Sequence, residues 1–63
     1  MRITLNGEPR ELADGTTIAV LLGESTRGRA VVVDGEVIPR AAWPDYRLQQ
    51  GQHIELITAV QGG

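Results

Sequence analysis

The chain of 63 residues has no cysteine, no lysine and no apolar run long enough to cross a bilayer. Without cysteine, disulfides and thiolate metal sites are excluded, and the single histidine has no second ligand beside it that would indicate a metal site. Without lysine, no ubiquitin-like chain can be built on this protein's own side chains. Because there is also no signal peptide, we expect a cytoplasmic protein that does not associate with membranes.

The charge balance of the chain is mild. The six basic residues are all arginines, and with eight acidic residues they give a formal net charge of -2. The arginines are scattered along the chain, which argues against nucleic-acid binding through counterion release. A chain of this length forms one domain near the lower size limit for independent folding. We expect it to be monomeric when no partner is bound.

Alternating apolar and polar residues predict a hairpin at the N-terminus. Ile3 and Leu5 alternate with polar neighbours, which is typical of a strand with one buried face. The pair at 6–7, Asn-Gly, favours a type I′ turn, and residues 8–12 would return as the second strand. Because Pro9 cannot donate a backbone hydrogen bond, this second strand is expected at an edge of the sheet.

A short helix is expected after a turn at residues 14–15. Thr16 or Thr17 can cap its N-terminus, and Gly23 is placed to end it after about residue 22. Three apolar side chains at i, i+3 and i+4 form the stripe that would face a sheet: Ile18, Leu21 and Leu22.

Three further strands are predicted at residues 29–33, 36–38 and 53–59. An Asp-Gly turn at 34–35 joins the first two, and one helical turn is expected at 41–43. The order strand, strand, helix, strand, strand, strand is typical of an α+β fold of the β-grasp (ubiquitin-like) type. In that fold a mixed sheet of four to five strands packs on one short helix, and the first and last strands lie parallel at its centre.

The predicted core is formed by apolar side chains from every element: Ile3, Leu5, Leu12, Ile18, Leu21, Leu22, Val31, Val33, Ile38, Trp43, Leu48, Ile54 and Leu56. A slip of one residue would turn Val32 inward in place of Val31 and Val33. Trp43 and Tyr46 could form a stacking surface for a ligand, but with only two aromatic residues in the chain a plug beneath the loop at 39–48 is favoured.

The last two residues, Gly62 and Gly63, form the most informative motif. Because glycine has no Cβ, the pair makes a thin arm that can enter a channel too narrow for other residues. A terminal carboxylate is ionised at neutral pH and is a poor electrophile until it is activated. We therefore expect residues 1–59 to form the β-grasp domain and residues 60–63 to form a flexible tail. The alternative is an ordinary frayed terminus.

The residues described so far resemble the ThiS family, the ubiquitin-like sulfur carriers of thiamine biosynthesis. The resemblance is strongest at 31–40, where the run Ile-Pro-Arg at 38–40 followed by Trp43 is its most specific part. It continues through Leu48, Gly51, Ile54-Glu55 and Val60 to Gly63. The β-grasp and the diglycine are shared with the small subunit of molybdopterin synthase and with ubiquitin. Asp34 departs from the Asn, and Gln52 from the Asp, that are common in the family.

The resemblance implies that the protein is a cosubstrate of enzymes, with no catalytic residue, metal or bound cofactor of its own. An E1-like adenylyltransferase of the ThiF type would use ATP to convert the Gly63 carboxylate into an acyl-adenylate. A persulfide from a cysteine desulfurase or another donor would then give a thiocarboxylate. A thiazole synthase of the ThiG type would accept that sulfur.

Two groups of residues are candidates for contact with these partners. The tail residues that would thread into partner active sites are Val60, Gln61 and Gly62. Ile57 and Arg40 are candidate docking residues. Single exposed apolar residues are common on protein surfaces, so Ile57 could be an ordinary surface residue with no partner. Arg40 could equally be a solvated charge.

Other functions remain open from the residues alone. The carrier could deliver sulfur for molybdopterin, a thiolated tRNA or cysteine, or the chain could be a protein modifier joined to lysines through Gly63. An enzyme that uses His53 as base and Ser25 as nucleophile is disfavoured because nothing orients the pair. A strand histidine on the solvent side is the simpler interpretation.

Overall fold

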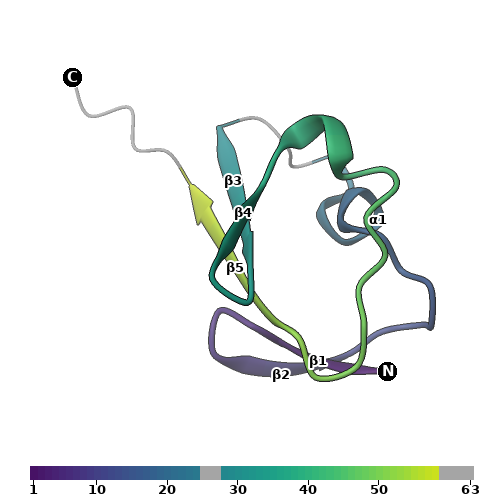
Figure 1. The fold of residues 1–63 in the computed structure, drawn as a ribbon. Helices are drawn as coiled ribbons and strands as arrows, with labels where there is room; N and C mark the ends of the chain where they lie inside the picture. Colours follow the sequence, from purple (N-terminus) through teal and green to yellow (C-terminus); the bar gives the residue numbers. More distant parts are fainter. Residues whose placement is uncertain (25–27, 59–63) are drawn as a thin grey trace.

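The structure, a computed structural model, describes residues 1–24 and 28–58 and has the predicted architecture of a mixed sheet with one short helix. In chain order the elements are β1 (Arg2–Leu5), β2 (Glu8–Glu11), α1 (Ile18–Leu22), β3 (Arg29–Val33), β4 (Glu36–Ile38), the 3₁₀ helix η1 (Arg40–Ala42) and β5 (His53–Thr58). The strand order in the sheet is β2-β1-β5-β3-β4, and α1 lies on one side of the sheet (Figure 1).

The N-terminal hairpin forms as its sequence predicts. Leu5 pairs with Glu8 across a two-residue turn in which Asn6 and Gly7 have φ values of 51° and 83°. Two consecutive positive φ values define the type I′ turn whose twist matches the flanking strands. β2 is an edge strand with all four residues exposed, which confirms the position inferred from Pro9. It ends at Glu11, one residue earlier than predicted.

The last strand occupies the centre of the sheet. β5 is parallel to β1, with Leu5 opposite Ile54, and antiparallel to β3 from Val33 opposite Ile54 to Arg29 opposite Thr58. The predicted parallel pairing of the first and last strands is therefore confirmed. β5 consequently has a hydrogen-bonded neighbour on each side, at least over its first residues, and is the strand that leads toward the C-terminus (Figure 1).

The helix begins and ends at the predicted residues. Thr17 is its N-cap, and its side-chain oxygen accepts a hydrogen bond from the Val20 N–H at 3.2 Å. Gly23 ends the helix with φ 60°, a value that favours glycine, and its N–H donates to the Ala19 carbonyl. Thr16 has a different role, because its hydroxyl donates to the Ala13 carbonyl at 2.6 Å.

The loop that follows η1 supplies partners for the first turn of the helix. The N–H of Ile18 donates to the Tyr46 carbonyl at 3.0 Å and that of Ala19 to the Trp43 carbonyl at 3.2 Å. The first N–H groups of a helix have no acceptor within the helix, so acceptors from elsewhere satisfy them. Since a five-residue helix is marginal alone, these bonds and its apolar contacts with the sheet hold it in place.

The core is close to the prediction. Ten of the predicted side chains are buried: Ile3, Leu5, Ile18, Leu22, Val31, Val33, Ile38, Trp43, Leu48 and Ile54. The other three, Leu12, Leu21 and Leu56, are partly buried and pack against this cluster. Burial of Val31 and Val33 on one face of β3 also settles its register in favour of the prediction.

Trp43 is a plug, as predicted. Its side chain is 4% exposed, and its indole Nε1–H donates to the Ile38 carbonyl at 2.9 Å. Tyr46 is partly buried against the same cluster. The helical turn before Trp43 spans residues 40–42, one position earlier than expected, because the Trp43 N–H closes it by donating to the Arg40 carbonyl at 3.0 Å.

Candidate functional site

The residues of the predicted tail lie outside the described part of the structure. This applies to Val60, Gln61, Gly62 and Gly63. The body of the site is therefore β5, whose last residue, Thr58, is also the last described residue of the chain. The position and direction of this strand determine where the chain leaves the sheet after Thr58.

Two side chains from turns complete the hydrogen bonding of β5. The Asn6 Oδ1 accepts a hydrogen bond from the Leu56 N–H at 2.8 Å, and the Asp34 Oδ1 accepts one from the His53 N–H at 2.9 Å. The backbone of Asp34 adds a third bond, because its N–H donates to the His53 carbonyl at 2.8 Å. β5 is thus held from both sides by groups that lie outside the strand ladders.

Sequence reasoning missed both of these side chains, although a signal was present. Asn6 and Asp34 each precede a glycine in a two-residue turn, and both have positive φ, at 51° and 49°. Short Asx side chains in such turns readily accept bonds from nearby backbone N–H groups. Asp34 therefore has a structural role here. Gln52 also has one, since its side-chain oxygen accepts from the Gln49 N–H at 2.7 Å.

The side of the sheet away from α1 carries exposed apolar side chains on β4 and β5. Ile57 is 49% exposed and lies opposite Ala30, while Val37 is 66% exposed and lies opposite Val32. Because cross-strand partners share a face, these residues and Glu55, which lies opposite Val32, form one surface that we call the outer face. Val37 was not among the predicted docking residues, although its alternation with the buried Ile38 could have revealed it.

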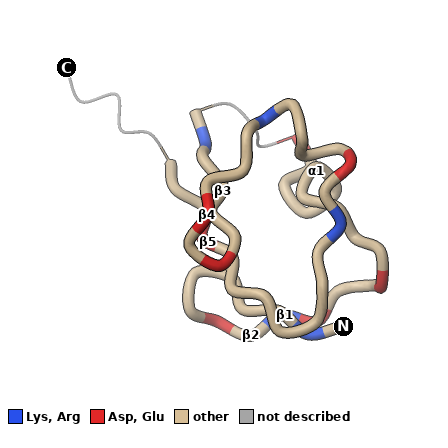
Figure 2. Tube along the Cα trace, viewed as in Figure 1, with Lys and Arg blue, Asp and Glu red and all other residues tan. Residues whose placement is uncertain are grey.

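Residues of both charges lie on or near this surface. Figure 2 shows red segments along β4 and β5, the strands that contain Glu36 and Glu55. Glu55 lies on the outer face, whereas Glu36 lies opposite the buried Val33 and therefore on the side of α1. Figure 2 also shows a blue segment at the start of β3, where Arg29 lies opposite Thr58 at the end of β5. The outer face therefore combines exposed aliphatic groups with one acidic side chain, Glu55, and the end of β5 lies beside a basic residue, Arg29.

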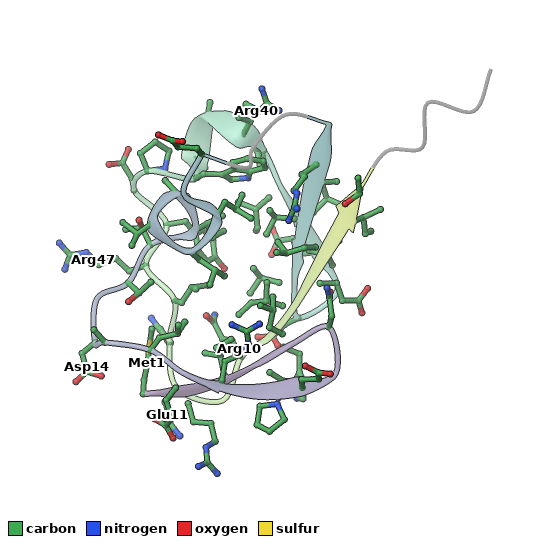
Figure 3. The ribbon with its side chains drawn as sticks, turned by 180° about the vertical axis from the view of Figure 1, so that it is seen from behind. Met1, Arg10, Glu11, Asp14, Arg40 and Arg47 are labelled. Atoms are coloured by element: carbon green, nitrogen blue, oxygen red, sulfur yellow. The ribbon has the colours of Figure 1, made fainter. Side chains whose placement is uncertain are left out.

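The two predicted docking residues lie on different parts of the surface. Arg40 is on η1 (Figure 3), and its guanidinium carbon lies 5.4 Å from the centroid of the Trp43 ring. That distance permits a cation–π interaction. Trp43 belongs to the core on the side of α1, because its carbonyl accepts from the Ala19 N–H, whereas Ile57 lies on the outer face. The structure does not bring Arg40 and Ile57 together on one face.

The rival sites gain no support in the described residues. His53 is exposed on β5, as expected, and Ser25 lies outside the described residues. Residues 1–24 and 28–58 contain no group of three or more His, Cys, Asp or Glu side chains that could hold a metal ion. Over the same ranges no helix is both long and apolar enough to span a bilayer.

Comparison with known proteins identifies similar sequences in one protein family. A model described as the ThiS family matches residues 3–63. The chain is 36% identical over 63 residues to a sulfur carrier protein ThiS of Thermus thermophilus, covering 97% of this chain and 98% of that protein. It is 29% identical over 66 residues to the sulfur carrier protein ThiS of Escherichia coli, with full coverage of both chains.

Two further similarities concern a larger protein and a solved structure. A thiazole synthase of Paramagnetospirillum magneticum is 29% identical over 66 residues, and the match covers 100% of this chain but only 20% of that protein. The chain therefore spans about a fifth of that relative's length. The crystal structure of a thiamine biosynthesis protein (ThiS) from Geobacter metallireducens superposes with a TM-score of 0.85, at 26% identity and with complete coverage of both chains.

Proposed function

The chain belongs to the ThiS family of sulfur carrier proteins of thiamine biosynthesis, and on this premise we propose that it carries sulfur at the C-terminal carbonyl of Gly63. A protein of this family is a carrier and not an enzyme.

The proposed cycle begins with activation of the carboxylate. A ThiF-type adenylyltransferase binds ATP, the Gly63 carboxylate attacks the α-phosphate, and pyrophosphate leaves. The sulfur of a partner's persulfide then attacks the carbonyl carbon and displaces AMP, which gives an acyl disulfide. A thiol cleaves its S–S bond and leaves a thiocarboxylate on Gly63. The carrier binds no cofactor in this scheme, because the activating enzyme binds the ATP.

The composition of the chain suits such an intermediate. An activated acyl group reacts with whichever nucleophile is held next to it. This chain has no cysteine thiol and no lysine amine that could capture its own adenylate or thiocarboxylate. At Gly62 and Gly63 no side chain crowds the carbonyl, so the positioned persulfide of a partner has access to it.

The observation that carries the proposal is the central position of β5. β1 and β3 bond to this strand, and Asn6 and Asp34 add side-chain bonds, so Thr58 has a fixed place in the sheet. We propose that residues 1–59 act as a rigid handle and that residues 60–63 extend from it as the arm that enters partner active sites. A carrier needs both parts, because recognition and chemistry occur at different places.

We propose that the outer face and the tail bind the partners together. Ile57 near the end of β5 and Val37 on β4 offer exposed aliphatic groups, and Arg40 offers a cation on another side for a second contact. The thiazole synthase of Paramagnetospirillum magneticum, which contains a region similar to this chain, supports a ThiG-type enzyme as one partner. The others are the ThiF-type enzyme and a cysteine desulfurase or another persulfide donor. All of them would act in the cytoplasm.

The test is to isolate the protein from its native cells and to measure its intact mass by mass spectrometry. The proposal predicts a fraction in which sulfur replaces one oxygen of the Gly63 carboxylate, increasing when the thiamine pathway is active. If Gly63 is found only in isopeptide bonds to lysines of other proteins, and no thiocarboxylate is detected, the protein is a modifier and not a sulfur carrier. A thiocarboxylate that forms independently of thiamine demand would point to another sulfur acceptor, such as molybdopterin or tRNA.

A further inference from the structure

The sheet has an open edge in its interior as well as at its two ends. β1 pairs with β5 only as far as Leu5 opposite Ile54, whereas β5 continues to Thr58. The hairpin turns away at Asn6, so in the described part of the chain the second half of β5 has β3 on one side and no strand on the other. Figure 3 shows this part of β5 running past the hairpin toward the C-terminal end.

The hydrogen bonds of β5 show which backbone groups point into this opening. On the β1 side the Ile54 carbonyl accepts from the Asn6 N–H, and the Leu56 N–H donates to the Asn6 Oδ1, both at 2.8 Å. Because backbone groups alternate in direction along a strand, the Leu56 carbonyl and the Thr58 N–H point to the same side. Among residues 1–24 and 28–58, neither group has a hydrogen-bond partner.

The outer edges of the sheet are different. β2 carries Pro9 and three charged residues, and Pro39 directly follows β4. Prolines and charges are common means of blocking the addition of another strand. The interior edge from Leu56 to Thr58 has neither on its own residues. It is also the edge that directly precedes the tail.

We propose that the edge of β5 at Leu56–Thr58 binds an extended main-chain segment of the enzyme that activates Gly63. An acceptor followed two residues later by a donor on the same side of a strand matches the backbone of another strand, which is how peptides add to open sheet edges. Such pairing fixes the direction in which the next residues leave the sheet, and it therefore aims the tail at the active site. The inference rests on the proposed function and names the contact that orients the arm.

Asn6 has a defined part in this arrangement. Its side chain ends the pairing between β1 and β5 by taking the Leu56 N–H. The first backbone group left for a partner is then the Leu56 carbonyl, so the added strand has one register. Asn6 is accordingly a positioning residue, and Thr58 provides the donor that a partner strand would use.

The test compares Thr58→Pro with two controls in binding to the ThiF-type adenylyltransferase. Proline removes the Thr58 N–H, which has no partner in the described residues, so the variant should fold normally by circular dichroism. Loss of one intermolecular hydrogen bond should weaken binding about five- to tenfold. Thr58→Val keeps the N–H and should bind like the unchanged protein. Glu11→Pro removes an N–H on the outer edge of β2 and should also leave binding unchanged.

Amide hydrogen exchange on the unchanged protein provides a second measurement that does not depend on any variant. The Thr58 amide should exchange rapidly in the isolated protein and at least about tenfold more slowly in the complex, whereas the Leu56 amide should be protected in both. Unchanged exchange at Thr58 in a saturated complex would overturn the proposal, as would equal binding by Thr58→Pro. If the enzyme fails to adenylate the unchanged protein, the proposed function fails as well. Normal adenylation together with an unprotected Thr58 amide would refute only the proposed pairing of the partner with the edge of β5.

Discussion

Replacement of Trp43 by alanine tests whether the core and the reactive end are separate. The indole is 4% exposed, its Nε1–H donates to the Ile38 carbonyl at 2.9 Å, and the Arg40 guanidinium lies over its ring. Trp43→Ala removes all three interactions and leaves a cavity beneath the loop at 39–48. We expect it to be among the most destabilising single changes in this domain.

The magnitude follows from the burial and the size of the domain. Truncation of a buried tryptophan to alanine costs about 3–5 kcal/mol. At about 0.05–0.15 kcal/mol per residue, 63 residues have a total stability of roughly 3–9 kcal/mol. Trp43→Ala should therefore leave a substantial fraction of the protein unfolded at room temperature. Trp43→Phe keeps an aromatic ring but leaves the Ile38 carbonyl without its hydrogen-bond donor, and it should reduce the free energy of unfolding by about 1–3 kcal/mol.

The assay is urea or thermal unfolding followed by far-ultraviolet circular dichroism, since the variants lack the fluorescent indole. Each kcal/mol should lower the melting temperature by about 4–8 °C in a domain of this size. Thiocarboxylate formation is then measured under conditions in which each variant is folded. A Trp43→Ala protein within about 1 kcal/mol of the original would refute the plug. A stable variant that fails to bind its partners would make Trp43 an interface residue.

Three further predictions concern the tail and the outer face. Deletion of Gly63 should abolish ATP–pyrophosphate exchange by the adenylyltransferase and leave the circular dichroism unchanged; normal exchange would show that another group reacts. Gly62→Val should also fold but block activation, because a β-branched side chain widens and stiffens the arm, and unaltered kinetics would mean a roomier channel. Ile57→Glu should weaken partner binding about tenfold, whereas Val20→Glu, at a 70% exposed position on α1, should not. Equal effects of these two substitutions on partner binding would show that the outer face is not part of the interface.

Most of the fold could be predicted because local patterns and long-range packing agree in this chain. Strict alternation in β1, the Asn-Gly and Asp-Gly pairs, and Gly23 after an apolar stripe each indicate one structure, and each is confirmed. The small errors lie at ends of elements, such as β2 and η1. There a single hydrogen bond decides the boundary, as with the Trp43 N–H on the Arg40 carbonyl.

The contacts that the sequence did not reveal join residues far apart in the chain. Asn6 and Leu56 are separated by 50 positions, and the Ile18 N–H finds its acceptor at Tyr46. No periodicity encodes such pairs, because they depend on how complete elements are placed. For the site, the diglycine and the family resemblance led to Gly63, and alternation with Ile38 could have indicated Val37. The open edge at Leu56–Thr58 emerged only from the pairing of the strands.

The arrangement of β5 explains why stability and chemistry should be separable in this protein. Side chains of the strand alternate between the core, at Ile54, and the outer face, at Ile57, so one strand supplies both core packing and the surface that we propose binds partners. Its backbone is bonded to β3 along its length, and this bonding does not depend on the residues that follow Thr58. Changes in the proposed tail should therefore alter activation without unfolding the domain. Changes in the core should alter activation only in proportion to the fraction of protein that remains folded.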